Sequence, residues 1–316
     1  MTRNYYYTES NCYLDRDGRE VPIPISNNRL IETMFAHLPT RAIMKFVSAA
    51  WFANLERLVL KSFFSAFSVT HFVRKNGIRL SEYKKKKYTS FQDFFCREIK
   101  PESRPFTVSE DALLSPCDCK ASVYRISEDY SFAIKGVPYT VGELLTDPAE
   151  SHFFNGGFLF LLRLSLDDYH HYMYPITGGK TADRVIPGKL MTVHPMIHKY
   201  AAVYRENARR YCLIFNPNTK QYVGVMQVGA LGVGKIVNDQ PGPADVVQGQ
   251  EQGHFEFGGS TILVLVPGGS YMPSADLLAN TKAGYETVVK MGERIGTLPA
   301  DCRAQFTVEG DDIIME

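Results

Sequence analysis

From Ser115 onward the sequence consists of short runs of β-branched and aromatic residues separated by glycine and proline, and this pattern constrains the fold most strongly. Three such runs are residues 157–166, 222–236 and 254–266. Runs of this length and composition, with turn residues between them, are typical of antiparallel strands joined by short connections. We therefore expect this half of the chain to form a mostly antiparallel sheet.

The amino-terminal part of the chain follows different patterns. Residues 4–28 are polar and rich in turn formers, with a tight turn predicted at Asp17-Gly18 and helix disfavoured by two prolines. From residue 30 to residue 72, apolar side chains recur at helical spacing. This spacing predicts two helices with a break near Pro39.

These patterns together predict an α+β protein in three parts. An N-terminal arm over residues 1–29, either extended or a short hairpin, precedes a helical and basic segment over residues 30–90. A β-rich domain over residues 91–316 follows, with a helical turn expected within 137–145 and a further strand over 186–193. A chain of 316 residues with 45% hydrophobic residues is sufficient for a large packed core.

The helical segment allows two compatible interpretations. Its main apolar stripe can pack on the protein core, with the charged side chains in solvent. Alternatively it lies on an anionic lipid surface, because Phe52, Leu60 and Phe64 fall outside that stripe and the basic run Lys84–Lys87 follows. Residues 41–87 carry a net charge of +9, whereas the rest of the chain carries −8. The main stripe comprises Ile43, Val47, Ala50, Trp51, Leu55, Leu58, Val59, Ser62, Phe63 and Phe67.

Composition limits the class of protein further. The net charge of the whole chain is only +1, which gives no indication of a nucleic-acid partner. The six cysteines lack Cys-x-x-Cys spacing, and no second pair completes a tetrahedral set with Cys117 and Cys119, so we expect a reducing cytoplasmic compartment and no metal. No apolar run approaches the roughly 20 residues of a spanning helix, so membrane contact should be peripheral.

The segment from His254 to Leu265 predicts a strand, a break at Gly258-Gly259-Ser260-Thr261 and a second strand. An ordinary turn accounts for this pattern on its own. A chemical interpretation is also open, because a backbone conformation that only glycine tolerates can bring the Ser260 hydroxyl onto the unhindered carbonyl of Gly259. With a base nearby, the acyl group shifts from nitrogen to oxygen. Elimination and hydrolysis then leave a pyruvoyl group on the new amino terminus.

Five motifs occur in a fixed order along the chain. They are Phe94–Glu98 with Arg104-Pro105, Leu114–Asp118, Leu162–His170, Val228–Gly234 and Gly249–Thr261. In this order they resemble the phosphatidylserine decarboxylase family of pyruvoyl-dependent, self-cleaving proenzymes. The similarity extends from about residue 30 to residue 296.

The resemblance implies roles for three side chains. Ser260 becomes the pyruvoyl group after cleavage of the Gly259–Ser260 bond. His170 takes the proton of the Ser260 hydroxyl, and Asp118 orients the imidazole and stabilises its charged form.

The resemblance also implies an activity and its partners. The covalent pyruvoyl ketone forms a Schiff base with the amine of phosphatidylserine, and phosphatidylethanolamine and carbon dioxide are the products, without a metal or pyridoxal phosphate. The cleaved chains, residues 1–259 and residues 260–316, stay associated through sheet pairing, and a dimer of such units is expected. The expected location is peripheral, at an anionic membrane surface on the cytoplasmic side of the cell membrane.

The sequence departs from the family pattern near the expected base. Many members carry a second histidine three positions after the one that matches His170, where this chain has Met173. His171 is therefore a secondary candidate. His194 is another, because it follows an expected strand and could line the pocket. If His170 and His171 lie on one strand they point to opposite faces, so His171 is expected at the surface or in a supporting role.

Two other functions remain open. A pyruvoyl-dependent decarboxylase of a soluble amino acid would share the self-cleaving core, but the basic and apolar residues 41–87 favour a lipid. A non-catalytic, β-rich membrane-binding protein would carry Gly259-Ser260 as a simple turn. The joint presence of Asp118, His170 and Ser260 argues against that reading.

Overall fold

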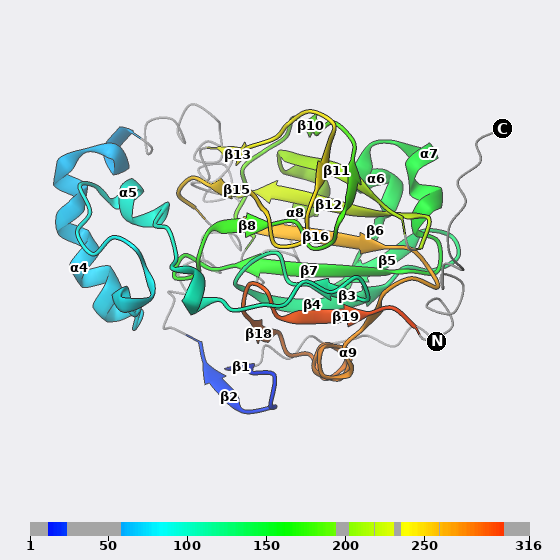
Figure 1. Cartoon of the computed structure of the whole chain (residues 1–316), viewed down its shortest axis with the longest axis horizontal. Coiled ribbons are helices and arrows are strands. Elements are labelled where there is room, and N and C mark those ends of the chain that lie inside the picture. Colours follow the sequence, from blue (N-terminus) through cyan, green and yellow to red (C-terminus); the bar gives the residue numbers. More distant parts are fainter. Residues whose placement is uncertain are drawn as a thin grey trace, which may run out of the picture.

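An eleven-stranded sheet runs through the middle of the molecule (Figure 1). The structure is a computed structural model that describes residues 12–23, 58–193, 202–217, 219–230, 235–258 and 260–299. The strands follow the order β14, β9, β11, β12, β16, β7, β4, β18, β1, β2, and β10 pairs with β11. The pairing is antiparallel except between β1 and β18. The strands are β1 Cys12–Leu14, β2 Glu20–Pro22, β4 Cys119–Arg125, β7 Phe158–Leu164, β9 Gly178–Lys180, β10 Arg184–Ile186, β11 Arg209–Asn216, β12 Gln221–Gly229, β14 Ala244–Val246, β16 Ser260–Val266 and β18 Thr287–Val289.

Two three-stranded sheets and a hairpin complete the described β structure. One small sheet has the order β13-β15-β8 and another the order β17-β19-β3, while β5 pairs with β6. The first of these packs on the main core, since Tyr172 of β8 and Phe255 of β15 are fully buried in it. The bounds are β3 Ala112–Leu114, β5 Ser131–Ile134, β6 Val137–Thr140, β8 His171–Met173, β13 Ile236–Asn238, β15 Glu251–Phe255, β17 Met272–Pro273 and β19 Arg294–Thr297.

The helices are short and lie around the sheet. The helices α4 and α5 form a separate body at one end of the molecule, whereas α6 and α7 lie toward the other end (Figure 1). Within the described ranges no helix combines the length and the apolar character needed to cross a bilayer. The bounds are α4 Ala66–Lys75, α5 Phe91–Phe95, α6 Val141–Leu145, α7 Pro148–Ser151, α8 Val203–Glu206 and α9 Ala275–Lys282.

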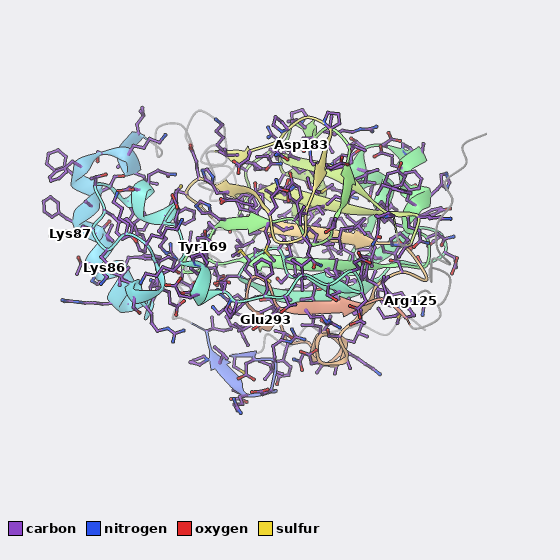
Figure 2. The ribbon with its side chains drawn as sticks, in the orientation of Figure 1. Lys86, Lys87, Arg125, Tyr169, Asp183 and Glu293 are labelled. Carbon is purple, nitrogen blue, oxygen red and sulfur yellow. The ribbon has the colours of Figure 1, made fainter. Side chains whose placement is uncertain are left out.

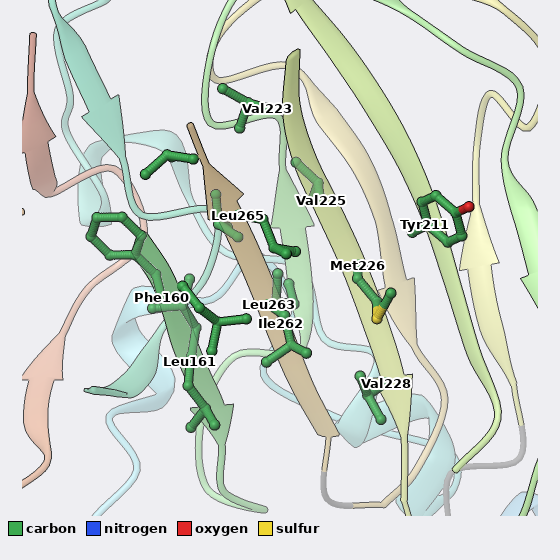
Figure 3. Close-up of a cluster of buried hydrophobic side chains, with 14 of the residues drawn as sticks. Phe160, Leu161, Tyr211, Val223, Val225, Met226, Val228, Ile262, Leu263 and Leu265 are labelled. Atoms are coloured by element: carbon green, nitrogen blue, oxygen red, sulfur yellow. The ribbon is translucent and has the colours of Figure 1, made fainter. Parts of the chain in front are cut away.

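Strand β16 lies in the centre of the core (Figure 3). All seven of its residues are buried, which explains why its sequence is almost continuously apolar and does not alternate. It pairs along its whole length with β7 and along nearly all of it with β12. A residue at the start of this strand is therefore held on both sides by backbone hydrogen bonds.

The β1–β2 hairpin is joined to the main sheet by a buried polar network. The guanidinium of Arg163 on β7 donates to the carboxylate of Glu286 and to the hydroxyl of Tyr13 on β1. Lys135 also donates to Glu286, at 3.2 Å. Of the two forms expected for the N-terminal arm, the described residues 12–23 form the short hairpin, with the predicted turn at Asp17-Gly18.

The expected α+β class is confirmed, and so are the main strands. Residues 157–166 contain β7, residues 222–236 contain most of β12, and residues 254–266 contain the end of β15 and all of β16. The helical turn expected within 137–145 is α6. The strand expected over 186–193 is wrong, because β10 ends at Ile186, directly before a proline that cannot donate to a ladder.

The apolar stripe expected to pack on the core is also wrong where the structure describes it. Leu58, Val59, Phe63 and Phe67 are at least 60% exposed, while Leu60, expected off the stripe, packs against the cluster around α5. A 3-10 turn, Phe63–Ser65, interrupts the α-helical period before α4 begins, and apolar stripe residues on both sides of it face solvent. Ser62, also on the stripe, is half-buried. The break at Pro39, Phe52 and the other stripe residues, Ile43, Val47, Ala50, Trp51 and Leu55, lie outside the described residues.

Candidate active site

Ser260 is the first residue of β16 and is fully buried. Its neighbours in the sheet are Gly229 on β12 and Leu164 on β7. The residue two positions earlier, Gly258, has a φ of 133°, which only glycine adopts without strain. The hydroxyl therefore lies where a glycine-dependent backbone conformation leads into the central strand.

His170 lies directly before β8, and its ring faces Ser260. Nδ1 is 3.3 Å from Oγ of Ser260, and Nε2 is 3.0 Å from the carbonyl oxygen of Ser165. A carbonyl can only accept a hydrogen bond, so Nε2 carries the proton in the neutral ring and Nδ1 presents a lone pair to the hydroxyl. Burial, followed by the charge of Arg97, holds the pKa of His170 well below its ordinary value. The ring is therefore neutral at physiological pH and can accept the serine proton.

The Ser165 carbonyl is fixed by the turn that follows β7. Oδ2 of Asp168 accepts a hydrogen bond from the backbone N–H of Ser165, at 2.7 Å. Asp168 is held in turn by the ammonium of buried Lys120, at 2.7 Å from both carboxylate oxygens. Burial lowers the pKa of Lys120, but the carboxylates of Asp168 and Asp167 outweigh that effect and raise it. Burial raises the pKa of Asp168, so the hydrogen bonds of the Lys120–Asp168 pair, and not its net charge, are what hold the turn.

Arg97 holds the same turn from the side of α5. Its guanidinium donates to the backbone carbonyls of Asp167, at 3.0 Å, and Asp168, at 2.8 Å, and it is almost completely buried. Reasoning from the sequence did not assign roles to Arg97, Lys120 or Asp168. Arg97 and Asp168 belong to two of the ordered motifs, and this was the feature of the sequence that could have identified them as site residues.

Asp118 lies at the start of β4 and is bound by other groups. Both of its carboxylate oxygens accept hydrogen bonds from buried Arg104, and the backbone N–H of Met291 donates to Oδ1 at 2.9 Å. Nζ of Lys290 is 3.5 Å from Oδ2. Burial raises the pKa of Asp118, but Arg104 and Lys290 lower it by more, so the carboxylate is charged. Among the described residues its hydrogen bonds include none to His170.

Asp118 nevertheless lies close to the turn that serves His170. A partly open pocket of about 180 Å³ is lined by Asp118 and Arg104 together with Asp167, Asp168 and Lys290. The structure therefore brings Ser260 and His170 together directly. It places Asp118 in a pocket that Asp167 and Asp168 also line.

The secondary candidate His171 is not at the surface. Only 8% of it is exposed, and its ring stacks between those of Tyr169 and His254. Nδ1 lies 2.5 Å from a carboxylate oxygen of Glu251, and Nε2 lies 3.3 Å from the carbonyl oxygen of Cys96. The expected surface position is therefore wrong, because β15 and the end of α5 enclose the ring. Its partners differ from those of His170, as expected for neighbouring strand positions.

The remaining expected site residues are placed as follows. Met173 is buried with Ala112 and Leu114 and packs near Met291, whose N–H binds Asp118. His194 and Gly259 lie outside the described residues. Within the described ranges, no three His, Cys, Asp or Glu side chains are grouped so as to hold a metal ion.

A serine hydroxyl and a neutral imidazole, both buried at the start of a central strand, define an enzyme site in which histidine activates a hydroxyl. Residues 91–297 match the family model described as phosphatidylserine decarboxylase. The chain belongs to the phosphatidylserine decarboxylase family and is an enzyme.

Individual relatives support this assignment. The chain is 38% identical over 270 residues to phosphatidylserine decarboxylase proenzyme 2 of Clostridium acetobutylicum, covering 85% of this chain and 92% of that protein. It is 36% identical over 231 residues to the phosphatidylserine decarboxylase proenzyme of Chlamydia caviae, covering 71% and 76%. It is 32% identical over 277 residues to that of Ruminiclostridium cellulolyticum, covering 86% and 92%.

Proposed function

We propose that this protein cleaves itself between Gly259 and Ser260 and then decarboxylates phosphatidylserine. One observation carries the proposal: the lone pair of a neutral, buried imidazole on His170 faces the Ser260 hydroxyl at 3.3 Å. A base in this position and protonation state is what self-cleavage at serine requires. The relatives are named proenzymes, which agrees with the proposal.

The cleavage follows from the chemistry of these groups. Nδ1 of His170 takes the hydroxyl proton as Oγ of Ser260 attacks the carbonyl carbon of Gly259, and the carbon–nitrogen bond breaks as the nitrogen regains a proton. Removal of the α-proton of residue 260 then breaks the Cβ–Oγ bond of this ester. The Gly259 carboxylate leaves with Oγ, and residue 260 becomes dehydroalanine. Addition of water to the dehydroalanine and loss of ammonia complete the change at that residue.

The residues present fit the pyruvoyl group that the family implies. Ser260 is fully buried, so a ketone formed there is shielded from bulk water. The pyruvoyl ketone supplies an electrophilic carbonyl for the amine of the substrate and accepts the electron pair released with carbon dioxide. We propose that His170 holds a proton on Nδ1 and returns it to the substrate carbon.

We propose that Asp118 supports His170 indirectly, without contacting the imidazole. The carbonyl of Ser165 orients His170 at Nε2, and Asp118 fixes Arg104 and the backbone of Met291 beside the turn that carries that carbonyl. The carboxylate thus acts on the base through the Asp167–Asp168 turn. It remains part of the catalytic set that the sequence predicts, without touching the reacting atoms.

We further propose that the body formed by α4 and α5 docks on an anionic membrane on the cytoplasmic side of the cell. Phe63, Phe64 and Phe67 are 67%, 80% and 75% exposed, which is unusual for three neighbouring aromatic side chains. Lys86 and Lys87 are exposed at the same end of the molecule (Figure 2). Apolar side chains with basic residues beside them suit an anionic lipid surface.

The membrane surface also favours a lipid over a soluble amino acid as the substrate. The test compares carbon dioxide release from vesicles of phosphatidylserine with release from free serine at equal headgroup concentration. Release from vesicles alone supports the proposal. Equal or faster release from free serine would replace it with the soluble-amine decarboxylase.

Mass spectrometry of the purified protein tests self-cleavage. We expect two chains, residues 1–259 and residues 260–316, the smaller of which reacts with carbonyl reagents. Ser260→Ala should give one intact chain and no carbon dioxide, and Ser270→Ala, a buried serine of the same fragment with no hydrogen-bond partner for its hydroxyl within the described structure, is the matched control that should cleave. A single intact, unreactive wild-type chain would contradict the proposal.

A further inference from the structure

Helix α5 contacts both the base, His170, and the loop that leads to Ser260. It is a single short helix, capped by the hydroxyl of Ser90, which accepts a hydrogen bond from the backbone of Asp93. Apart from Asp93, its residues are buried. A helix of five residues has little stability of its own, so its position depends on these packed side chains.

The first contact is between Phe95 and the base. The ring of Phe95 lies on the imidazole of His170, with 4.0 Å between ring centroids and 30° between ring planes. Both side chains are fully buried. Nδ1 of His170 faces the hydroxyl of Ser260, and Nε2 faces the carbonyl of Ser165. The ring of Phe95 covers one face of the imidazole. Rotation of the imidazole away from Ser260 is thereby opposed.

The second contact is between Gln92 and the loop that leads to the cut. Oε1 of Gln92 accepts a hydrogen bond from the backbone N–H of Phe257, at 3.3 Å, and Nε2 lies 3.0 Å from the sulfur of Cys96. The side chain of Phe257 packs against the cluster around α5. Its ring centroid lies 5.4 Å from that of Phe91 and 5.1 Å from that of Phe95. The backbone three residues before Ser260 is therefore tied to α5.

We propose that Gln92 and Phe95 are positioning residues for self-cleavage. Phe95 fixes the plane of the His170 ring, and Gln92 fixes the loop that carries the scissile bond. Phe95 acts through the imidazole of His170, and Gln92 acts through the backbone of Phe257. This inference rests on the proposed self-cleavage and adds residues to it that the ordered motifs and the hydroxyl–imidazole pair do not assign.

The physical reason is the freedom of the loop. Two consecutive glycines precede Ser260, and glycine has more accessible backbone conformations than any other residue. Attack on a neighbouring carbonyl needs the reacting atoms near van der Waals contact, and a misplacement of about 1 Å can cost on the order of 100-fold in rate. A hydrogen bond and an aromatic contact at Phe257 restrict the loop just before these glycines.

The proenzyme is made by in vitro translation and transferred at once to buffers of different pH, and the rate of its self-cleavage is measured in each. Phe95→Leu should cleave about tenfold more slowly on the high-pH plateau, because the imidazole loses its fixed orientation. The acid limb of its pH profile should also move to higher pH, because the ring is less shielded from water. Phe94→Leu is the matched control: Phe94 is equally buried on the same helix, and its ring contacts are to Phe72, Phe91, Tyr88 and Arg97.

For Gln92 the comparison is between two substitutions of similar size. Gln92→Met removes the acceptor for the Phe257 N–H and should slow cleavage about tenfold, whereas Gln92→Glu keeps an oxygen there and should restore most of the rate on the plateau. Urea unfolding of each variant, made with Ser260→Ala to prevent cleavage, measures its stability separately. A purely structural role for Gln92 would give the same rate for both substitutions at equal stability.

The outcomes separate this inference from the proposed function. If the wild type cleaves and Phe95→Leu retains both the rate and the pH profile, Phe95 is not a positioning residue. If Phe94→Leu and Phe95→Leu slow cleavage equally with no shift in pH, the effect is loss of stability and the inference fails. If the wild type does not cleave, the proposed function fails, and this inference fails with it.

Discussion

Arg104 donates hydrogen bonds to both carboxylate oxygens of Asp118, and both side chains are buried. A paired guanidinium and carboxylate with this geometry hold each other firmly and leave little freedom for either. Lys290 and the backbone of Met291 occupy further positions around the same carboxylate. The charge of Asp118 therefore stabilises the packing of residues 290–292 against the start of β4, close to the active site.

Replacing Asp118 with asparagine is expected to destabilise the protein, because buried Arg104 loses the carboxylate that accepts from its Nε and Nη2 and keeps Glu82 as a carboxylate partner. Loss of one member of a buried pair costs about 3 kcal/mol, which urea unfolding at neutral pH can measure. The folded-state pKa of Asp118 is lowered, so its contribution is present above the unfolded-state pKa and is lost as the pH falls through the folded-state value. The difference between wild type and Asp118→Asn should therefore narrow in acid.

The same variant tests the role of Asp118 in cleavage. Where it remains folded, Asp118→Asn should cleave more slowly than the wild type but faster than His170→Ala, which lacks the base. Asp245→Asn, an exposed aspartate, is the control and should match the wild type in both assays. Complete loss of cleavage in folded Asp118→Asn would mean that the carboxylate acts directly on the imidazole.

The pH dependence of cleavage should identify His170 as the base. Its pKa is lowered well below the ordinary value for histidine, so the rate should be flat from about pH 8 to about pH 6.5 and fall only at lower pH. The free energy of unfolding should also fall as the pH drops below about 6.5, because the unfolded state then binds a proton on His170 that the folded state does not. Unfolding of Ser260→Ala and of Ser260→Ala with His170→Gln over this range measures the stability effect. A rate that already falls near pH 7 would point to a more exposed base.

Much of this site could be read from the sequence, but its geometry could not. Ser260 was identifiable from the glycine before it and from the ordered motifs, and His170 was identifiable from the ordered motifs. The carbonyl of Ser165 could not be identified, because every residue has a carbonyl and its direction depends on a turn held by Arg97 and Lys120 from distant strands and helices. The burial of His171 depends in the same way on the placement of β15 and α5.

The fold shows a similar division. Continuous apolar runs such as β16 were predictable, because a strand covered on both faces needs apolar residues at every position. The exposure of Phe63 and Phe67 was not, because periodicity shows which residues share a face but not whether that face meets the core or solvent. Nor was the 3-10 turn over Phe63–Ser65 that precedes α4. Hydrogen bonds from the hydroxyl of Ser65 to the carbonyls of Leu60 and Ser62 stabilise that turn, and periodicity alone gives no sign of them.

Substitution of the exposed phenylalanines should weaken membrane binding. Replacing Phe63, Phe64 and Phe67 with serine removes apolar surface that can insert between lipids, and binding to phosphatidylserine vesicles should fall by roughly tenfold or more. Decarboxylation of vesicles should fall in parallel, whereas self-cleavage should not change. The control replaces three exposed apolar residues on other elements, Val185, Phe215 and Val247. An equal loss of binding in both triple variants would contradict docking through α4.

The two cleaved chains should stay together, because cleavage leaves β16 in place between β7 and β12. Its backbone hydrogen bonds to both neighbours lie after Ser260 and do not depend on the bond to residue 259. The cleaved protein should therefore elute as one species in gel filtration and separate into two chains only in denaturant.

Proline substitution tests whether this pairing holds the small chain. Val264→Pro removes a ladder hydrogen bond in the middle of the central strand and introduces a steric conflict, at a cost of about 3 kcal/mol or more, and should release or prevent assembly of the small chain. Val185→Pro places the same change on β10, which pairs with β11 alone among the described strands and is 63% exposed, so it should leave the chains associated. If wild-type chains separate without denaturant, sheet pairing through β16 is not what joins them.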